Sequence, residues 1–204
     1  TPTNLFAYVR YVIPNSDAAA KGITRGMLFN SVDGTPLTES NYNSLLFGDN
    51  TSYIIDFADY NNGNPTSNGT SIEVTKTQIQ ENPIAVSKVI TDGTQKIGYL
   101  MYNQFSSSFD AELNAAFANF KTETVNDLII DLRYNGGGSV RTATYLGSMV
   151  TGQFNGELFS KQVWNEKVQA AIDESNFTNN FTNKINHGNI NEAINSLGLT
   201  RVYF

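Results

Sequence analysis

Three consecutive glycines, Gly136 to Gly138, form the segment of this 204-residue chain whose residue types are best suited to chemistry. They lie in residues 131–139 (Asp-Leu-Arg-Tyr-Asn-Gly-Gly-Gly-Ser), between an apolar run that predicts a buried strand and a pattern that predicts a helix. Glycine lets the backbone turn sharply and approach a ligand closely, and the N–H groups of a helix's first turn carry partial positive charge. Such a loop can hold a phosphate, a carboxylate or the oxyanion of an acyl-transfer intermediate.

The spacing around the glycines disfavours phosphate. No Gly-Lys-Ser/Thr follows, as a P-loop requires, and Arg141 stands where the third glycine of Gly-x-Gly-x-x-Gly would be. A purely structural interpretation stays open, in which the glycines only allow a tight turn from strand to helix.

Side chains that commonly perform catalysis or bind metals are scarce. The chain has no cysteine and one histidine, which excludes disulfides, thiolate catalysis and a multi-histidine metal site. A Ser-His-Asp triad would have to use His187, which lies in a polar stretch and is predicted to be an exposed loop residue. No cofactor and no metal site are predicted.

The composition points to a folded protein whose partners are not nucleic acids. Hydrophobic residues make up 40% of the chain, including 13 Phe and 10 Tyr, which is enough for a buried core. The formal net charge of −6 and the pI of about 4.7 disfavour nucleic-acid binding, which needs a clustered basic surface. The apolar runs are too short to span a membrane.

The glycine loop must be positioned by elements of the second half of the chain. Residues 96–102 predict a strand, residues 110–121 a helix, and residues 127–132 a buried strand. This order predicts a βαβ unit with parallel strands. Residues 139–150 predict a second helix with four inward positions, namely Val140, Ala143, Leu146 and Val150.

The end of the chain shows a weaker pattern. Residues 151–199 predict an irregular, helical excursion, and residues 200–204 (Thr-Arg-Val-Tyr-Phe) are typical of the beginning of another buried strand.

The first half predicts short β elements with small helices. Gln78 to Pro83 is the most plausible boundary, which gives domains at 1–83 and 84–204. The pattern predicts strands at 6–13, 27–32, 52–57 and 71–77, a helical turn at 15–20, a helix at 38–46 and a loose hairpin loop around 61–65.

The second half of the chain resembles a known family. Residues 131–138 closely resemble the Asp-Leu-Arg-x-Asn-Pro-Gly-Gly signature of carboxyl-terminal processing (tail-specific) serine peptidases, with Gly136 in place of the usual proline. Residues 96–105 (Lys-Ile-Gly-Tyr-Leu-Met-Tyr-Asn-Gln-Phe) are similar to that family's Ile-Gly-Tyr strand and the polar-Phe run after it.

The first half is similar to the PDZ domain of these peptidases. The resemblance is carried by residues 12–19, 22–26 and 32–37, with Asp17 in place of a usual proline and Met27 in place of a usual aspartate. The two sets of motifs occur in the family's order and together cover roughly residues 8–150.

The resemblance implies a fold of the α+β to α/β class. A PDZ-like β-rich domain, truncated at its N-terminus, would be followed by the first half of a βαβ peptidase domain of the crotonase or Clp-protease kind. The carboxylate-binding loop of the PDZ-like domain should precede residues 8–13, where only residues 1–6 remain.

The resemblance also implies an activity. The parent would be a serine-type peptidase that hydrolyses peptide bonds in polypeptides with a Ser-Lys dyad and recognises substrate C-termini through its PDZ domain. Both dyad residues are expected beyond residue 204, so this fragment alone should be inactive. The family's usual location predicts the bacterial cell envelope or secretion.

The implied site residues come from the glycine loop. The backbone N–H of Gly137 or Gly138 would be one of two oxyanion donors, and Asn135 and Gly136 would shape the loop and bind substrate. Ser139 is predicted to cap the next helix, and Asp131 and Arg133 are predicted to be structural. Three lysines are predicted to be solvated, namely Lys161, Lys167 and Lys184.

An alternative of a different class remains open. A non-catalytic peptide-binding protein could keep this scaffold and lack the dyad. The predicted partner is then still a polypeptide or peptide C-terminus, and the oligomeric state is not predicted.

Overall fold

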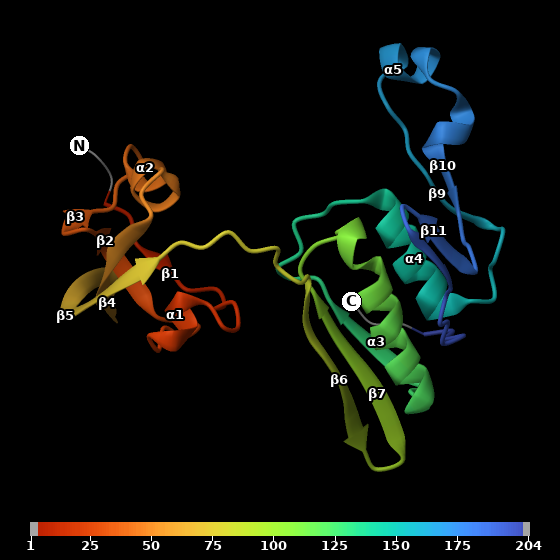
Figure 1. Ribbon diagram of the computed structural model, residues 1–204, viewed down its shortest axis with the longest axis horizontal. Coiled ribbons are helices and arrows are strands. Elements are labelled where there is room, and N and C mark those ends of the chain that lie inside the picture. The colour runs from red at the N-terminus through yellow and green to blue at the C-terminus, as the bar shows by residue number, and fades with distance from the viewer. Residues whose placement is uncertain (1–3, 202–204) are drawn as a thin grey trace. The chain divides into compact units, whose positions relative to one another are not determined.

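The computed structural model describes residues 4–201, which form two compact units divided between Glu81 and Asn82 (Figure 1). The sequence placed this boundary after Pro83. The fold is mixed α+β with several small sheets. Of the strand predicted at 200–204, Thr200 and Arg201 are described and do not lie in a strand. Residues 202–204 and the start of the chain before Asn4 lie outside the described residues.

The first unit is built on one antiparallel sheet with strand order β1-β2-β4-β5, and β3 also pairs with β2. Its elements are β1 (Ala7–Tyr8), α1 (Asp17–Ala20), β2 (Leu28–Val32), β3 (Thr35–Pro36), α2 (Tyr42–Phe47), β4 (Ser52–Asn61) and β5 (Asn64–Thr75). Two predicted elements are shorter in the structure. The strand predicted at 6–13 is only the two-residue β1, and the helix predicted at 38–46 is α2, which begins four residues later.

The β4–β5 hairpin corrects the loose loop expected around residues 61–65. Asn61 pairs with Asn64, which leaves a two-residue turn at Asn62 and Gly63. Both turn residues have positive φ, 48° and 91°, as the tight hairpin turn with right-handed strand twist requires. The Asn-Gly pair therefore extends both strands well beyond their apolar parts.

The core of the first unit lies between this sheet and the segments that cross it. Val32 and Leu37 are almost fully buried, and Phe29 pairs with Phe57 across β2 and β4. The remaining buried members are Ile23, Ile55 and Val74.

The second unit has a three-stranded sheet with order β6-β7-β8. It contains β6 (Ile84–Asp92), β7 (Gln95–Tyr102) and β8 (Asp127–Asp131). The parallel pairing predicted between the second-half strands is confirmed, because β7 runs parallel to β8 with Tyr99 opposite Ile129. The sequence analysis missed β6, which pairs antiparallel with β7 through a hairpin at Gly93.

Two helices cover one face of this sheet: α3 (Asp110–Thr122), which follows the short 3-10 helix η1 (Ser107–Phe109), and α4 (Val140–Thr151). The predicted inward residues of α3 are confirmed, since Leu113, Phe117 and Phe120 are fully buried against Leu100 and Leu128. On α4, Leu146 and Val150 are buried as predicted, whereas Val140 is exposed because it begins the first turn.

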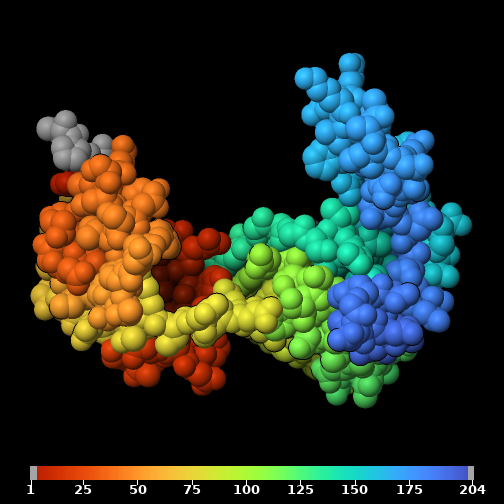
Figure 2. Space-filling view, turned by 45° about the horizontal axis from the view of Figure 1, so that its top comes forward, coloured from red at the N-terminus to blue at the C-terminus, as the bar shows by residue number. Residues whose placement is uncertain are grey.

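Residues 152–199 are not the helical excursion that was expected. They form β9 (Leu158–Lys161), α5 (Glu166–Ala171), the 3-10 helix η2 (Glu174–Phe177), β10 (Thr178–Asn180) and a hairpin of β11 (Lys184–His187) and β12 (Ile190–Ala193). Figures 1 and 2 show β9, α5 and β10 rising from the second unit as an arm. The hairpin packs on the core through Ile185, which is fully buried.

Candidate functional site

The glycine loop lies where the parallel strands β7 and β8 end, the edge at which open α/β sheets bind ligands. The side chain of Asn135 holds the loop in place from within. Its Nδ2 donates to the carbonyl of Tyr102 at the end of β7 (2.9 Å), and its Oδ1 accepts from the N–H of Gly137 (2.7 Å). Asn135 is thus placed to shape the loop.

The segment after β7 pairs with the loop along its length. Phe105 N–H donates to the carbonyl of Gly137 (2.9 Å), and Ser139 N–H donates to the carbonyl of Phe105 (2.8 Å). Gly138 lies between these bonds with a φ of 133°, and a Cβ there would sit 2.2 Å from the Phe105 oxygen. The close approach of the two backbones therefore requires glycine at 138.

The three glycine N–H groups differ in what they can offer a ligand. Gly136 N–H donates to the carbonyl of Asn103 (3.3 Å), and Gly137 N–H is held by Asn135. Within residues 4–201, the N–H of Gly138 has no acceptor, and Gly138 is exposed. Of the two predicted oxyanion donors, Gly138 is therefore the one whose hydrogen is available in this structure.

Asn103 is a residue of this site that the sequence analysis did not single out. Its side chain is nearly buried, and neither its Oδ1 nor its Nδ2 has a hydrogen-bond partner in the described part of the chain. Buried amides normally satisfy both atoms. No motif marks this position, and its proximity to the loop follows from the backbone bond between Gly136 and Asn103.

Asp131 and Arg133, which the sequence predicted to be structural, form an ion pair with each other. The Arg133 Nε and Nη2 donate to the buried carboxylate of Asp131 at 3.0 and 2.7 Å, and Tyr99 Oη donates to it at 2.7 Å. The Arg133 hydrogen bonds hold the pKa of Asp131 well below its usual range, and the Asp131 carboxylate raises the pKa of Tyr99. This cluster anchors the last residue of β8 and the start of the loop.

The remaining sequence candidates have other roles. Ser139 caps α4 as predicted, because its Oγ accepts from Thr142 N–H at 3.2 Å. Lys161, Lys167 and Lys184 are exposed, as predicted. The described residues contain no group of three or more His, Asp or Glu side chains that could hold a metal ion.

His187 is not the exposed loop residue that was expected. It ends β11, its side chain is 15% exposed, and its Nε2 lies 2.7 Å from the Oδ2 of Asp110, a fully buried carboxylate. Its ring stacks on Tyr145 with centroids 5.9 Å apart. Burial raises the pKa of Asp110. The alternation of residues 184–187 before a Gly-Asn turn was a hairpin signal that the polar composition obscured.

Comparison with known proteins relates part of the second unit to one family. Residues 96–187, which include β7, the loop and α4, match the model of peptidase family S41. The chain is therefore related to this serine peptidase family over that segment. No curated protein sequence matches the chain.

Two solved structures of peptidases are similar to the chain. A putative S41 protease from Bacteroides fragilis is 25% identical with a TM-score of 0.66, and the match covers 100% of this chain and 52% of that one. A photosystem II D1 C-terminal processing protease is 18% identical with a TM-score of 0.47, covering 74% and 44%. The chain thus spans about half the length of the structures it matches.

Proposed function

We propose that the protein to which this chain belongs is a serine-type peptidase that hydrolyses peptide bonds in polypeptides. The nucleophilic serine and a lysine general base lie beyond residue 204. A desolvated lysine can act as a base near neutral pH, which suits a chain whose one histidine is engaged with Asp110.

The observation that carries the proposal is that Gly138, an exposed residue at the carboxyl edge of the parallel strands, has an N–H with no acceptor within residues 4–201. It supports a role as one donor to the oxyanion that forms when a serine attacks a peptide carbonyl. Asn135 keeps the neighbouring Gly137 N–H turned into the loop, and the Phe105 pairing holds Gly138 rigid. Preorganised donors of this kind stabilise the transition state without reorganising during the reaction.

The first unit would serve as a PDZ-like domain that recognises substrate C-termini. Its motifs at 12–19, 22–26 and 32–37 and the likeness of the full chain to the Bacteroides fragilis structure support this assignment. Titration with an apolar peptide and its amidated twin tests it, and equal affinities would contradict carboxylate capture. The same resemblance supports a place in the bacterial cell envelope or outside the cell.

The decisive experiment compares the parent protein with residues 1–204 alone. A fluorophosphonate that labels activated serines should modify the parent at a serine beyond Phe204 and leave the shorter chain unlabelled. Only the chain that takes up the label should hydrolyse an unfolded protein substrate. Alanine at position 138 keeps the N–H, but its Cβ would lie 2.2 Å from the Phe105 oxygen and so displace the loop. Gly138→Ala in the parent should therefore lower kcat by about 100-fold or more, as loss of one oxyanion donor does.

Lys121→Ala is the control, since Lys121 is an exposed residue in the last turn of α3, outside the glycine loop. It should keep most of the activity. Serine-dependent proteolysis by residues 1–204 alone would refute the proposal. A parent that binds peptides but lacks a reactive serine would instead be a non-catalytic peptide-binding protein.

A further inference from the structure

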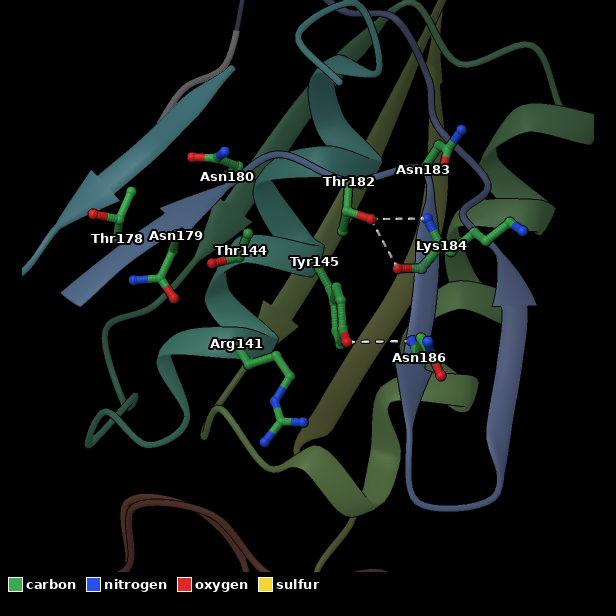
Figure 3. Close-up of a pocket in the computed structure, with 10 residues that line it drawn as sticks. All are labelled: Arg141, Thr144, Tyr145, Thr178, Asn179, Asn180, Thr182, Asn183, Lys184 and Asn186. Atoms are coloured by element: carbon green, nitrogen blue, oxygen red, sulfur yellow. Dashed lines mark hydrogen bonds between the residues drawn. The ribbon is translucent and has the colours of Figure 1, made fainter. Parts of the chain in front are cut away.

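The arm and α4 enclose a polar groove in the second unit that the proposed catalytic site does not use. We call it the α4–β10 groove, and it has a volume of about 470 Å³. Figure 3 shows its ten lining residues: Arg141, Thr144, Tyr145, Thr178, Asn179, Asn180, Thr182, Asn183, Lys184 and Asn186.

A tandem repeat builds one wall of this groove. Residues 176–183 are two copies of Asn-Phe-Thr-Asn. Phe177 is buried, and the ring of Phe181 packs against Phe159 with centroids 5.1 Å apart. Gly147 lets the arm approach α4, because a Cβ there would lie 2.6 Å from the Phe159 ring. The apolar residue of each repeat thus anchors the arm, and the Thr and Asn residues line the groove.

The lining is rich in hydrogen-bonding groups and contains no carboxylate. Arg141 is exposed and makes no hydrogen bond or ion pair within residues 4–201. In Figure 3 the side chain of Lys184 extends away from the other labelled residues. Arg141 is therefore the cation that an occupant of the groove would meet.

The two strands beside the groove present different edges to it. The edge of β11 is covered, because Thr182 Oγ1 bonds both the N–H and the carbonyl of Lys184, and Tyr145 Oη accepts from Asn186 N–H (Figure 3). These three contacts occupy the polar groups that β11 turns towards α4.

The edge of β10 is not covered by a strand, since β10 pairs with β9 alone among the described strands. The carbonyl of Phe177 and the N–H of Phe181 bond to the β9 side. By strand alternation, the intervening Thr178 and Asn180 direct their backbone groups away from β9 and towards the groove. The Thr178 N–H already donates to the carbonyl of Ser175, so the Thr178 carbonyl and the N–H and carbonyl of Asn180 are the groups left for a partner within residues 4–201. An unpaired edge of this kind can accept an added strand.

We propose that the α4–β10 groove binds an extended, acidic polypeptide segment. The segment adds as a strand to β10, and one of its carboxylates pairs with the Arg141 guanidinium. Arginine favours such contacts because its fork of N–H donors matches a carboxylate. Side chains of Asn180, Asn183 and Asn186, which make no hydrogen bond within residues 4–201, complete the polar contacts.

A role of the groove in substrate selection rests on the proposed function, in which the substrate is a polypeptide. Arg141 lies in the first turn of α4, three residues after Gly138, so Arg141 is within reach of a polypeptide that passes the glycine loop. The groove would thus select substrates with an acidic stretch near the cleaved bond.

The test measures binding to the 204-residue chain by fluorescence anisotropy, without any hydrolysis. The probe is a labelled, N-acetylated and C-amidated hexapeptide of alternating Thr and Glu. Its twins replace Glu by Gln, or carry N-methyl groups on alternate backbone nitrogens. The amide end removes capture of a C-terminal carboxylate by the first unit.

We expect the Glu peptide to bind at least tenfold tighter than the Gln twin and the N-methylated twin. Arg141→Gln should abolish the preference for Glu, whereas Lys167→Gln, which removes an exposed cation of the arm, should not. Amide NMR shifts should concentrate at residues 178–180. Melting temperatures of both variants verify that they fold.

Equal affinity for the Glu and Gln peptides, or an unchanged preference in Arg141→Gln, would overturn the proposal. So would the absence of any peptide binding, or binding of an oligosaccharide of uronic acids in place of peptide. Arg141-dependent binding by a parent without peptidase activity would leave the groove in place and refute only the proposed catalytic function.

Discussion

Replacement of the loop glycines by alanine, one at a time, tests how the candidate site is held together. At Gly138 the added Cβ would lie 2.2 Å from the Phe105 oxygen and 2.9 Å from its carbonyl carbon, at a φ of 133°. The backbones must separate, because neither contact is with a flexible side chain. At Gly137 the φ is 97° but nothing lies within 4 Å, and at Gly136 there is neither a contact nor a positive φ.

The expected cost of Gly138→Ala follows from what the separation breaks. Two hydrogen bonds, from Phe105 N–H and from Ser139 N–H, contribute about 1 kcal/mol each. The strained backbone adds about 1–3 kcal/mol. The total is about 3–5 kcal/mol of unfolding free energy. Gly137→Ala should cost about 1–2 kcal/mol from its dihedral alone, and Gly136→Ala about 0.5 kcal/mol or less.

Amide hydrogen exchange is a suitable assay, because the chain has two units and exchange reports on each of them separately. Core amides of β7, β8 and α3 in Gly138→Ala should exchange roughly 100 to 4,000 times faster, since each 1.4 kcal/mol is a factor of ten. Amides of β4 and β5 in the first unit serve as an internal reference. Equal effects of Gly136→Ala and Gly138→Ala, or a change below about 0.5 kcal/mol for Gly138→Ala, would refute this account.

Three further predictions concern buried contacts of the second unit. Arg133→Gln should lower the free energy of unfolding above about pH 4, and the difference in this free energy between variant and wild type should shrink at lower pH. The reason is that the lowered pKa of Asp131 stabilises the fold only while the carboxylate is ionised. Urea unfolding between pH 2 and 7 measures the difference, and a value that does not change with pH would contradict this account. His187→Ala should cost about 2 kcal/mol at pH 7 by leaving a buried carboxylate without this partner. That loss should be smaller at pH 4.5, where the raised pKa of Asp110 favours the neutral acid, and a larger loss in acid would refute the assigned sign. Phe117→Ala should cost about 3–5 kcal/mol in urea unfolding, because its ring is fully buried, whereas a cost below 1 kcal/mol would contradict the packing.

The local pattern predicted much of what positions the loop. The spacing of Leu113, Phe117 and Phe120 indicated which face of α3 is buried, and the apolar run at 127–132 indicated β8. Parallel pairing of the two strands followed from the order strand, helix, strand. The assignment of Ser139 as a helix cap followed from short-range chemistry, whereas the partner of Asp131 was not predicted and proved to be Arg133.

The errors lie where tertiary contacts outweigh local composition. The polar residues 184–187 become a strand because Ile185 enters the core and His187 meets Asp110, which is 77 positions away in the sequence. Residues 61–75 contain few apolar side chains, so the sequence did not predict the full length of β5. That length depends on backbone pairing with β4 rather than on burial. Likewise, no local pattern reveals that β10 faces α4 across a groove.

By itself, the sequence determined that a glycine loop follows a buried strand and precedes a helix, since strand, turn and cap signals act over a few residues. It could not determine which of the glycine N–H groups is available. That depends on Asn103, Phe105 and Asn135, which take up or crowd the neighbouring groups only once β7 and β8 lie side by side. Only the tertiary structure therefore decides that Gly138 is the donor left for a ligand, because hydrogen bonds between distant backbone segments have no signature in local residue order.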